Sequence, residues 1–227
     1  MKIYKFREKE DYIFYLSEII SDTVKYKERL NRYLTEINDL AALNPDAKVI
    51  DAFTYESVSD KAKAILYYLF NLLGDESKSA ISYRKFRKRL VKGAPCLGTK
   101  FDTLTNEEAQ ISNSFNQHRN WGLHIPESLL TNKREIFEIT GVEIDKYKET
   151  VPLEVYEYFE IEYLTSLKTE LADVVSSVEV LENRMMQDYL KLAGVHFQVS
   201  LIHLKVKPYK IMDVVQGSLN TQTKKHT

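Results

Sequence analysis

The stretch DYIFYLSEIISDTVKYKERLNRYLTEINDL, residues 11–40, repeats mostly apolar or aromatic side chains at alternating steps of four and three residues. Seven residues make about two turns of helix, so this spacing lines the side chains along one helix face. The stripe ends before Asn44 and Pro45, a typical helix stop. The sequence therefore predicts one long helix with a continuous buried face. The stripe consists of Tyr12, Leu16, Ile19, Thr23, Tyr26, Leu30, Tyr33, Ile37 and Leu40.

A second stripe of the same kind lies further along the chain and ends just before Gly194. We expect its helix to begin near Pro152, because proline suits the first helical turn. Two stripes of about 40 Å, at 1.5 Å per residue, pack most simply against each other, or each against the same stripe of a second chain. The predicted fold class is therefore all-α, an elongated helical bundle. The second stripe consists of Leu164, Leu167, Leu171, Val174, Val178, Leu181, Met185 and Leu192.

The composition supports this fold class and limits the possible partners. With only 7 Gly and 5 Pro in 227 residues, the chain lacks the turn residues of an all-β protein. We expect one helical domain over residues 1–215 and a disordered tail over 216–227, QGSLNTQTKKHT. The net charge of −1 predicts no general attraction to nucleic acid or to anionic membranes. Any such affinity must therefore come from a local patch.

Three features predict a cytoplasmic protein without a membrane partner. Cys96 is the only cysteine, which rules out an intramolecular disulfide and favours a reducing compartment. The first residues, MKIYKFREKEDY, lack the apolar core of a signal peptide. The most apolar run, 64–73, is ten residues long, whereas a bilayer-spanning helix needs about 20.

Shorter elements are expected around the two stripes. A strongly apolar helix covers 57–73, and a basic amphipathic helix covers 79–92. Residues 105–108 (TNEE) form a capping box that opens a helix running towards Arg119. After Gly194 the pattern alternates with period two, which predicts a strand over 195–201. We expect this strand to pair with KIYKF, residues 2–6, as a minor strand pair near the termini.

The stretch HRNWGLHIP, residues 118–126, is the candidate functional site. In an uninterrupted helix, Arg119 and His124 would lie about 140° apart, on different faces. They converge only if the helix breaks, and Gly122 permits a break by adopting the left-handed conformation. Pro126 then suits the first turn of a further helix. The sequence thus predicts an arginine at the end of one helix and a histidine at the start of the next.

This arrangement suits chemistry on a phosphodiester. The Arg119 guanidinium offers a permanently charged fork that matches phosphate oxygens. A histidine at a helix N-terminus is favoured as the neutral base, because the helix dipole opposes its protonation. As a neutral base, His124 could take the proton from a ribose 2′-hydroxyl, whose oxygen then attacks the adjacent phosphorus. Arginine would stabilise the developing charge without a metal, and Asn120 could orient the imidazole or the ribose.

The motif Arg119-Asn120-x-x-x-His124, placed at a helix junction of an all-α bundle, resembles that of the HEPN superfamily. The resemblance covers about residues 55–190 in architecture. HEPN domains are helical bundles that commonly dimerise with their motifs facing each other. Many are metal-independent ribonucleases of toxin–antitoxin, abortive-infection and other anti-phage systems, and others are inactive binding or scaffold domains.

The resemblance implies the catalytic set Arg119, Asn120 and His124, RNA as substrate, and no cofactor or metal. It also implies a homodimer, with an antitoxin or sensor protein as a further partner. The family tends to have an acidic residue on a preceding helix. Asp60 and Glu56 are both available for that role, and the sequence does not select between them.

The basic helix supplies the local patch that RNA binding would need. Its cations would follow RNA phosphates towards the motif with a salt-dependent affinity. Alternatively, they form a solvated face that pairs with acidic neighbours such as residues 154–162, EVYEYFEIE. The predicted RNA-binding residues are Arg84, Lys85, Arg87, Lys88, Arg89 and Lys92.

The motif also has a purely structural interpretation. Arg119 would then pair with a glutamate and His124 would satisfy a helix end. Trp121 is expected in the core rather than as a base-stacking platform, and His118 is expected to face solvent. Two other functions stay open: a non-catalytic interaction protein that binds a partner through the two long helices, and an RNA-binding protein without cleavage.

Overall fold

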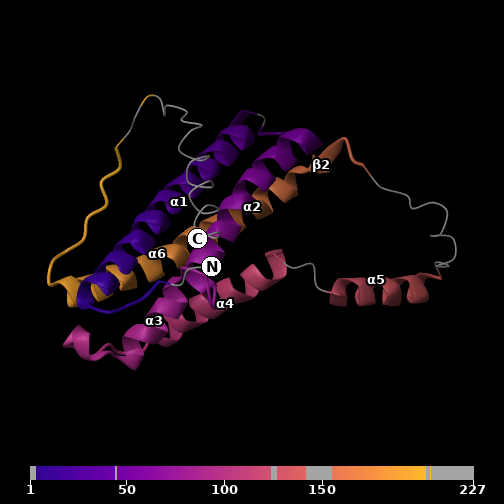
Figure 1. The fold of residues 1–227 in the computed structure, drawn as a ribbon. Coiled ribbons are helices and arrows are strands. Elements are labelled where there is room, and N and C mark those ends of the chain that lie inside the picture. Colours follow the sequence, from indigo (N-terminus) through magenta and orange to yellow (C-terminus); the bar gives the residue numbers. More distant parts are fainter. Residues whose placement is uncertain (1–3, 44, 124–126, 142–154, 203–204, 206–227) are drawn as a thin grey trace, which may run out of the picture. The chain divides into compact units, whose positions relative to one another are not determined.

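The computed structural model describes residues 4–43, 45–123, 127–141, 155–202 and 205, with the backbone alone at 122–123 and 127–129. Most of these residues are helical, which confirms the all-α prediction (Figure 1). The chain divides into two units, 1–197 and 198–227, and all helices and strands named below belong to the first. Among the described residues, no helix is both long and apolar enough to span a bilayer. The helices are α1 (Lys9–Leu43), α2 (Ala52–Gly74), α3 (Tyr83–Lys92), the 3₁₀ helix η1 (Pro95–Leu97), α4 (Asn106–Leu123), α5 (Glu127–Thr140) and α6 (Ile161–Ala193).

The longest helices, α1 and α6, pack against each other along the two predicted stripes (Figure 1). Leu16 and Leu30 of α1 and Leu171 and Leu181 of α6 are completely buried. Each aliphatic side chain removed from water in this way contributes about 1.5–3 kcal/mol. The two stripes therefore pack within one chain, which is the first of the two arrangements that their matched lengths predicted.

Helix α2 packs against both α1 and α4. Aromatic pairs form these contacts: Tyr68 stacks on Tyr26 of α1 with ring centroids 3.8 Å apart, and Phe70 lies 5.3 Å from Phe115 of α4. The helix begins earlier than predicted because Asp51 caps it. The Asp51 carboxylate accepts a hydrogen bond from the Thr54 N–H at 2.9 Å.

Helix α3 is amphipathic, as predicted, and its apolar face lies towards the interior. Tyr83, Phe86 and Leu90 are all completely buried. The helix begins after residue 79 because the cap is Ser82, whose hydroxyl accepts a hydrogen bond from the Lys85 N–H at 3.3 Å.

The strand pair differs from the prediction. Strands β1 (Val49–Asp51) and β2 (Tyr158–Glu160) pair antiparallel, whereas the described residues of 2–6 and 195–201 contain no strand. Alternation predicts one buried face, but a strand also needs a partner for its N–H and C=O groups. Strands β1 and β2 meet because they directly precede the neighbouring helices α2 and α6. Helix α6 consequently begins at Ile161, after β2, and not near Pro152, which lies outside the described residues.

Candidate active site

Arg119 lies near the C-terminal end of α4, and the start of this helix is the predicted capping box. The Thr105 N–H donates to the Glu108 carboxylate at 2.8 Å, and the Glu108 N–H donates to the Thr105 hydroxyl at 3.2 Å. This reciprocal pair fixes where α4 begins. It therefore also fixes which face of α4 carries Arg119.

The helix does not break at Gly122 as predicted. Helix α4 continues through Gly122 to Leu123, and α5 begins at Glu127. Glycine lowers helix propensity but does not by itself end a helix. His124 and Pro126 fall between the two helices and lie outside the described residues.

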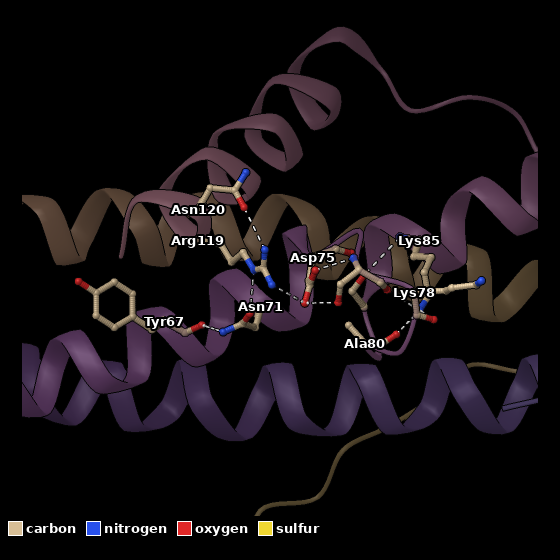
Figure 2. A network of polar contacts seen from close by, with 10 residues as sticks. Tyr67, Asn71, Asp75, Lys78, Ala80, Lys85, Arg119 and Asn120 are labelled. Carbon is tan, nitrogen blue, oxygen red and sulfur yellow. Dashed lines mark hydrogen bonds and ion pairs between the residues drawn. The ribbon is translucent and has the colours of Figure 1, made fainter. Parts of the chain in front are cut away.

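The Arg119 guanidinium is held by three side chains, as Figure 2 shows. Its Nε donates to the Asn71 Oδ1 at 3.2 Å, and its Nη2 forms an ion pair with the Asp75 Oδ2 at 3.3 Å. Its Nη1 donates to the Asn120 Oδ1 at 3.0 Å. The Arg119 side chain is only 20% exposed, so the ion pair is partly shielded from solvent.

Asp75 is itself fixed in place. It follows the last residue of α2, and its buried carboxylate accepts hydrogen bonds from the Ser77 N–H at 2.7 Å and the Ser77 hydroxyl at 3.0 Å. Asn71 is oriented as well, because its Nδ2 donates to the Tyr67 carbonyl at 2.8 Å (Figure 2). A buried carboxylate is tolerated only when it is paired, and Arg119 together with Ser77 supplies that pairing.

The loop that follows Asp75 is closed by a lysine. The Lys85 Nζ donates to the carbonyls of Ser77 at 3.1 Å and Lys78 at 3.2 Å, and also to that of Ala80 (Figure 2). Burial, together with the nearby Arg89, lowers the pKa of Lys85. These bonds use the lysine to fix a turn of the backbone, which in turn fixes the carboxylate that holds Arg119.

The arginine retains hydrogen-bonding capacity. A guanidinium has five N–H groups, and the three contacts above leave two of them without an acceptor among the described residues. Arg119 is therefore held in one orientation and still able to donate to a phosphate. The geometry fits a positioned phosphate-binding arginine, and it also fits an arginine that only joins α4 to α2.

Asn71 and Asp75 were not anticipated from the sequence. The acidic partner of Arg119 is Asp75, so neither Asp60 nor Glu56 fills that role. The sequence contains a pattern that could have indicated them. Asn71 and Asp75 are four residues apart, so they share one face at the end of an otherwise apolar helix. Asn120 contacts Arg119 in the structure, and its predicted contact with the His124 imidazole involves a residue outside the described part of the chain.

The prediction of solvent exposure is correct for His118, and the prediction of a core position is wrong for Trp121. His118 is exposed as expected, and its ring stacks on Phe70 at 5.3 Å. Trp121 is 63% exposed and does not belong to the core. The reason is geometric: two residues turn a helix by about 200°, so Trp121 points away from the face by which Arg119 meets α2.

The basic residues of α3 are mostly paired within the chain. Arg84 contacts Glu76 and donates to the Asn113 Oδ1 at 2.7 Å, and Lys88 pairs with the same Glu76 at 2.8 Å. The carboxylate that both cations share is Glu76, which follows α2 and is not one of the acidic residues 154–162. Lys85 binds backbone carbonyls, as described above. The alternative of a basic face paired with acidic neighbours therefore holds for this part of α3.

Arg87 was predicted to bind RNA, but its side chain is buried. Both Arg87 and Asp188 of α6 have side chains only 3% exposed, and the Arg87 Nη1 lies 3.3 Å from the Asp188 Oδ1. A guanidinium in this position cannot reach a phosphate in solvent. Arg89 and Lys92 are exposed, and Arg89 lies over the Phe6 ring at 5.0 Å.

Glu76 gives this region a pH-dependent contribution to stability. Hydrogen bonds from Lys88 and Arg84 hold the pKa of the Glu76 carboxyl below its usual value of 4.5. A lowered pKa means that the stabilisation is present above 4.5 and is lost as the pH falls through the folded-state pKa. We expect Glu76→Gln to lower the free energy of unfolding at pH 7 by less than about 1 kcal/mol, because the pair is partly exposed.

Urea unfolding of both proteins from neutral to acidic pH measures this difference. The gap between wild type and Glu76→Gln should close as the pH falls, whereas Glu170→Gln, at an exposed position of α6, should show no gap at any pH. A gap that persists at acidic pH would contradict the assignment to Glu76.

Comparison with known proteins adds no relative to these observations. The chain matches no family model, no curated protein and no solved structure. Within the described part of the chain, no group of three or more His, Cys, Asp or Glu residues is arranged to hold a metal ion.

Proposed function

We propose that the protein is a metal-independent endoribonuclease of the toxin or anti-phage type, which acts on RNA in the cytoplasm. The observation that carries the proposal is the fixed guanidinium of Arg119. Asp75 and Asn71 hold it, two of its N–H groups remain available, and it lies five residues before His124. The resemblance of the Arg119-Asn120-x-x-x-His124 motif to that of the HEPN superfamily supplies the type of reaction.

In the proposed mechanism, His124 removes the proton of a ribose 2′-hydroxyl. The 2′-oxygen then attacks the adjacent phosphorus, and the bond to the 5′-oxygen of the next nucleotide breaks. Arg119 balances the charge that develops on the non-bridging oxygens. The products are a 2′,3′-cyclic phosphate and a 5′-hydroxyl, the latter completed by a proton from the imidazolium. Asn120, Asn71 and Asp75 are positioning residues for Arg119.

The test compares cleavage of RNA by the wild type with cleavage by two single variants. We expect Arg119→Ala and His124→Ala each to lower the cleavage rate about 100-fold, as expected when a charge-stabilising group or a general base is removed. Arg134→Ala is the matched control, because Arg134 is an exposed arginine of α5 that pairs with Glu138 one turn away. EDTA should leave the rate unchanged.

Products with 5′-phosphate ends, or a strict requirement for magnesium, would contradict the mechanism. Growth of a bacterial host gives a second measurement, since induction of the wild type should be toxic and induction of His124→Ala should not. RNA binding without any cleaved product would assign the protein to the non-catalytic alternative. From the resemblance, the proposal also includes two kinds of partner: a second copy of the chain, whose motif faces that of the first, and an antitoxin or sensor protein.

The structure removes the observation on which the non-catalytic interaction protein was proposed. Such a protein uses the two heptad stripes to bind a partner, but these stripes are buried against each other in one chain. A charge at Leu30 or Leu171 would therefore act by destabilising the core. An interaction function requires a different surface.

A further inference from the structure

Exposed aromatic side chains gather where the start of α2 meets β2. Phe53 is 79% exposed, Tyr156 56% and Tyr158 59%, and the three line a hollow of about 380 Å³. Glu56 and Glu157 line the same hollow, and its described lining contains no lysine or arginine. A single exposed ring needs no explanation, whereas a cluster of them indicates a binding surface. We call these five side chains the acidic aromatic surface.

The exposed rings rest on a layer of packed ones. Phe159 of β2 has its ring centroid 5.0 Å from that of Tyr55 of α2 and 6.1 Å from that of Tyr156. The backbone is joined at the same place, because the Ala52 N–H donates to the Glu157 carbonyl at 2.9 Å. The surface is therefore preformed, which reduces the entropy cost of binding a partner.

The carboxylates of this surface are not neutralised by cations of the described chain. Residues 51–60 and residues 155–163 each contain three acidic residues and no lysine or arginine. Neither Glu56 nor Glu157 forms an ion pair with a described residue. Lys61, which follows the first of these segments, pairs with Glu36 of α1 at 3.0 Å instead. The negative charge around the exposed rings therefore remains available to a partner.

The combination of rings and carboxylates selects one class of partner. Carboxylates repel the phosphates of nucleic acid and of anionic lipid, which disfavours both at this surface. Aromatic rings attract cations over their faces, and the methylene groups of lysine and arginine pack on the same rings. A protein segment with lysine or arginine beside apolar residues therefore complements the rings and the carboxylates at once. A hydrated metal ion would use the carboxylates alone.

We propose that the acidic aromatic surface binds a cationic segment of a partner protein. Lysine or arginine side chains of that segment lie over the rings of Phe53 and Tyr158 and pair with Glu56 and Glu157. Apolar residues of the segment fill the hollow between the rings. Tyrosine is enriched among the residues that dominate protein interfaces, which agrees with this use of the surface.

The surface lies at the opposite end of α2 from the candidate active site. Phe53 is the second residue of α2, and Asn71, which holds Arg119, is in its last turn. Eighteen positions separate Phe53 from Asn71, or about 27 Å of helix at 1.5 Å per residue. Figure 1 shows β2 beside the start of this helix. The contact uses neither Arg119 nor His124, so it does not depend on the proposed ribonuclease activity.

The test selects binders from a displayed library of random peptides on the immobilised full-length protein. We expect the enriched peptides to carry lysine or arginine beside apolar residues. An enriched peptide, synthesised with a fluorescent label, then gives a dissociation constant by anisotropy. Phe53→Ser with Tyr158→Ser, and separately Glu56→Lys with Glu157→Lys, should each raise that constant at least about tenfold, because each pair of changes removes one of the two complementary features.

The charge-reversed protein gives an outcome that loss of folding cannot imitate. A library selected on Glu56→Lys with Glu157→Lys should yield acidic peptides in place of basic ones. Glu170→Lys with Asp173→Lys reverses two exposed carboxylates of α6 outside the surface and should leave the dissociation constant unchanged. His124→Ala should bind the peptide as the wild type does, so a failure of this proposal is distinguishable from a failure of the proposed catalysis.

The contrary outcomes are equally specific. A library without enrichment of basic residues would overturn the proposal, and so would enriched peptides whose binding both sets of variants leave unchanged. Binding that depends on Glu56 and Glu157 but not on Phe53 and Tyr158 would also overturn it, because it would show a general attraction of cations rather than a docking surface.

Discussion

Replacing Asp188 by alanine is expected to lower the free energy of unfolding by about 3–5 kcal/mol, because it leaves a buried arginine without its counter-charge. Asp188 of α6 accepts a hydrogen bond from the Tyr83 hydroxyl at 2.8 Å. It also pairs with Arg87 at 3.3 Å and with Arg184 at 3.4 Å. Burial raises the pKa of the Asp188 carboxyl, and the two arginines and the tyrosine oppose that effect.

The cost is large because the Arg87 side chain is only 3% exposed. Its side chain is buried between α3 and α6, and its remaining polar contact is to the Asp102 carbonyl. A guanidinium stays protonated in proteins, so it cannot relieve the burial by losing its charge. Tyr83 would lose its acceptor at the same time, which adds an unsatisfied buried hydroxyl.

Urea unfolding followed by circular dichroism measures the loss. Asp173→Ala is the control, because Asp173 is an exposed residue of the same helix, and it should change the free energy by no more than about 0.5 kcal/mol. A loss below about 1 kcal/mol for Asp188→Ala would show that Arg87 finds another partner or reaches solvent.

The second large effect is expected at Gly74, the last residue of α2. A methyl group at this position would lie 2.6 Å from the backbone nitrogen of Asn116 and 2.8 Å from the carbonyl carbon of Phe115. Both atoms belong to the backbone of α4, so no change of rotamer relieves the clash. We expect Gly74→Ala to cost about 3 kcal/mol, the upper part of the range for overpacking.

The sign of this effect is the reverse of the usual one, since alanine normally favours a helix over glycine by about 1 kcal/mol. Gly194→Ala is the comparison. Gly194 has a positive φ of 75°, and a Cβ added there would meet nothing within 4 Å. The expected loss of stability in Gly194→Ala, about 1–2 kcal/mol, therefore comes from backbone strain alone. A Gly74→Ala protein as stable as wild type would show that α2 and α4 separate easily.

The packing of the helices was predictable where the buried residues repeat along one face of a single helix. Most residues of the α1 and α6 stripes, and all of the Tyr83, Phe86, Leu90 stripe of α3, are buried because period and hydrophobicity act on the same residues. The capping box was predictable for a similar reason, as its two partners are three residues apart. The strand pair was not, because β1 and β2 lie more than 100 residues apart and pair through their backbones.

The candidate site was predictable only in part. Arg119 and Asn120 stand out as a motif, but their partners come from α2 and depend on how the helices pack. Arg87 illustrates the same limit. Six basic residues in one short helix suggest a solvent-facing surface, but Arg87 is buried because it pairs with Asp188, about 100 positions away in the sequence.

The exposure of Trp121 has a spectroscopic consequence. It is the only tryptophan of the chain, and it stands in solvent at the end of α4 rather than in the core. Emission selectively excited from tryptophan should already be red-shifted in the native protein and should change little as the core unfolds. The same fluorophore lies two residues from Arg119, so its emission reports on the end of α4 and not on the fold as a whole.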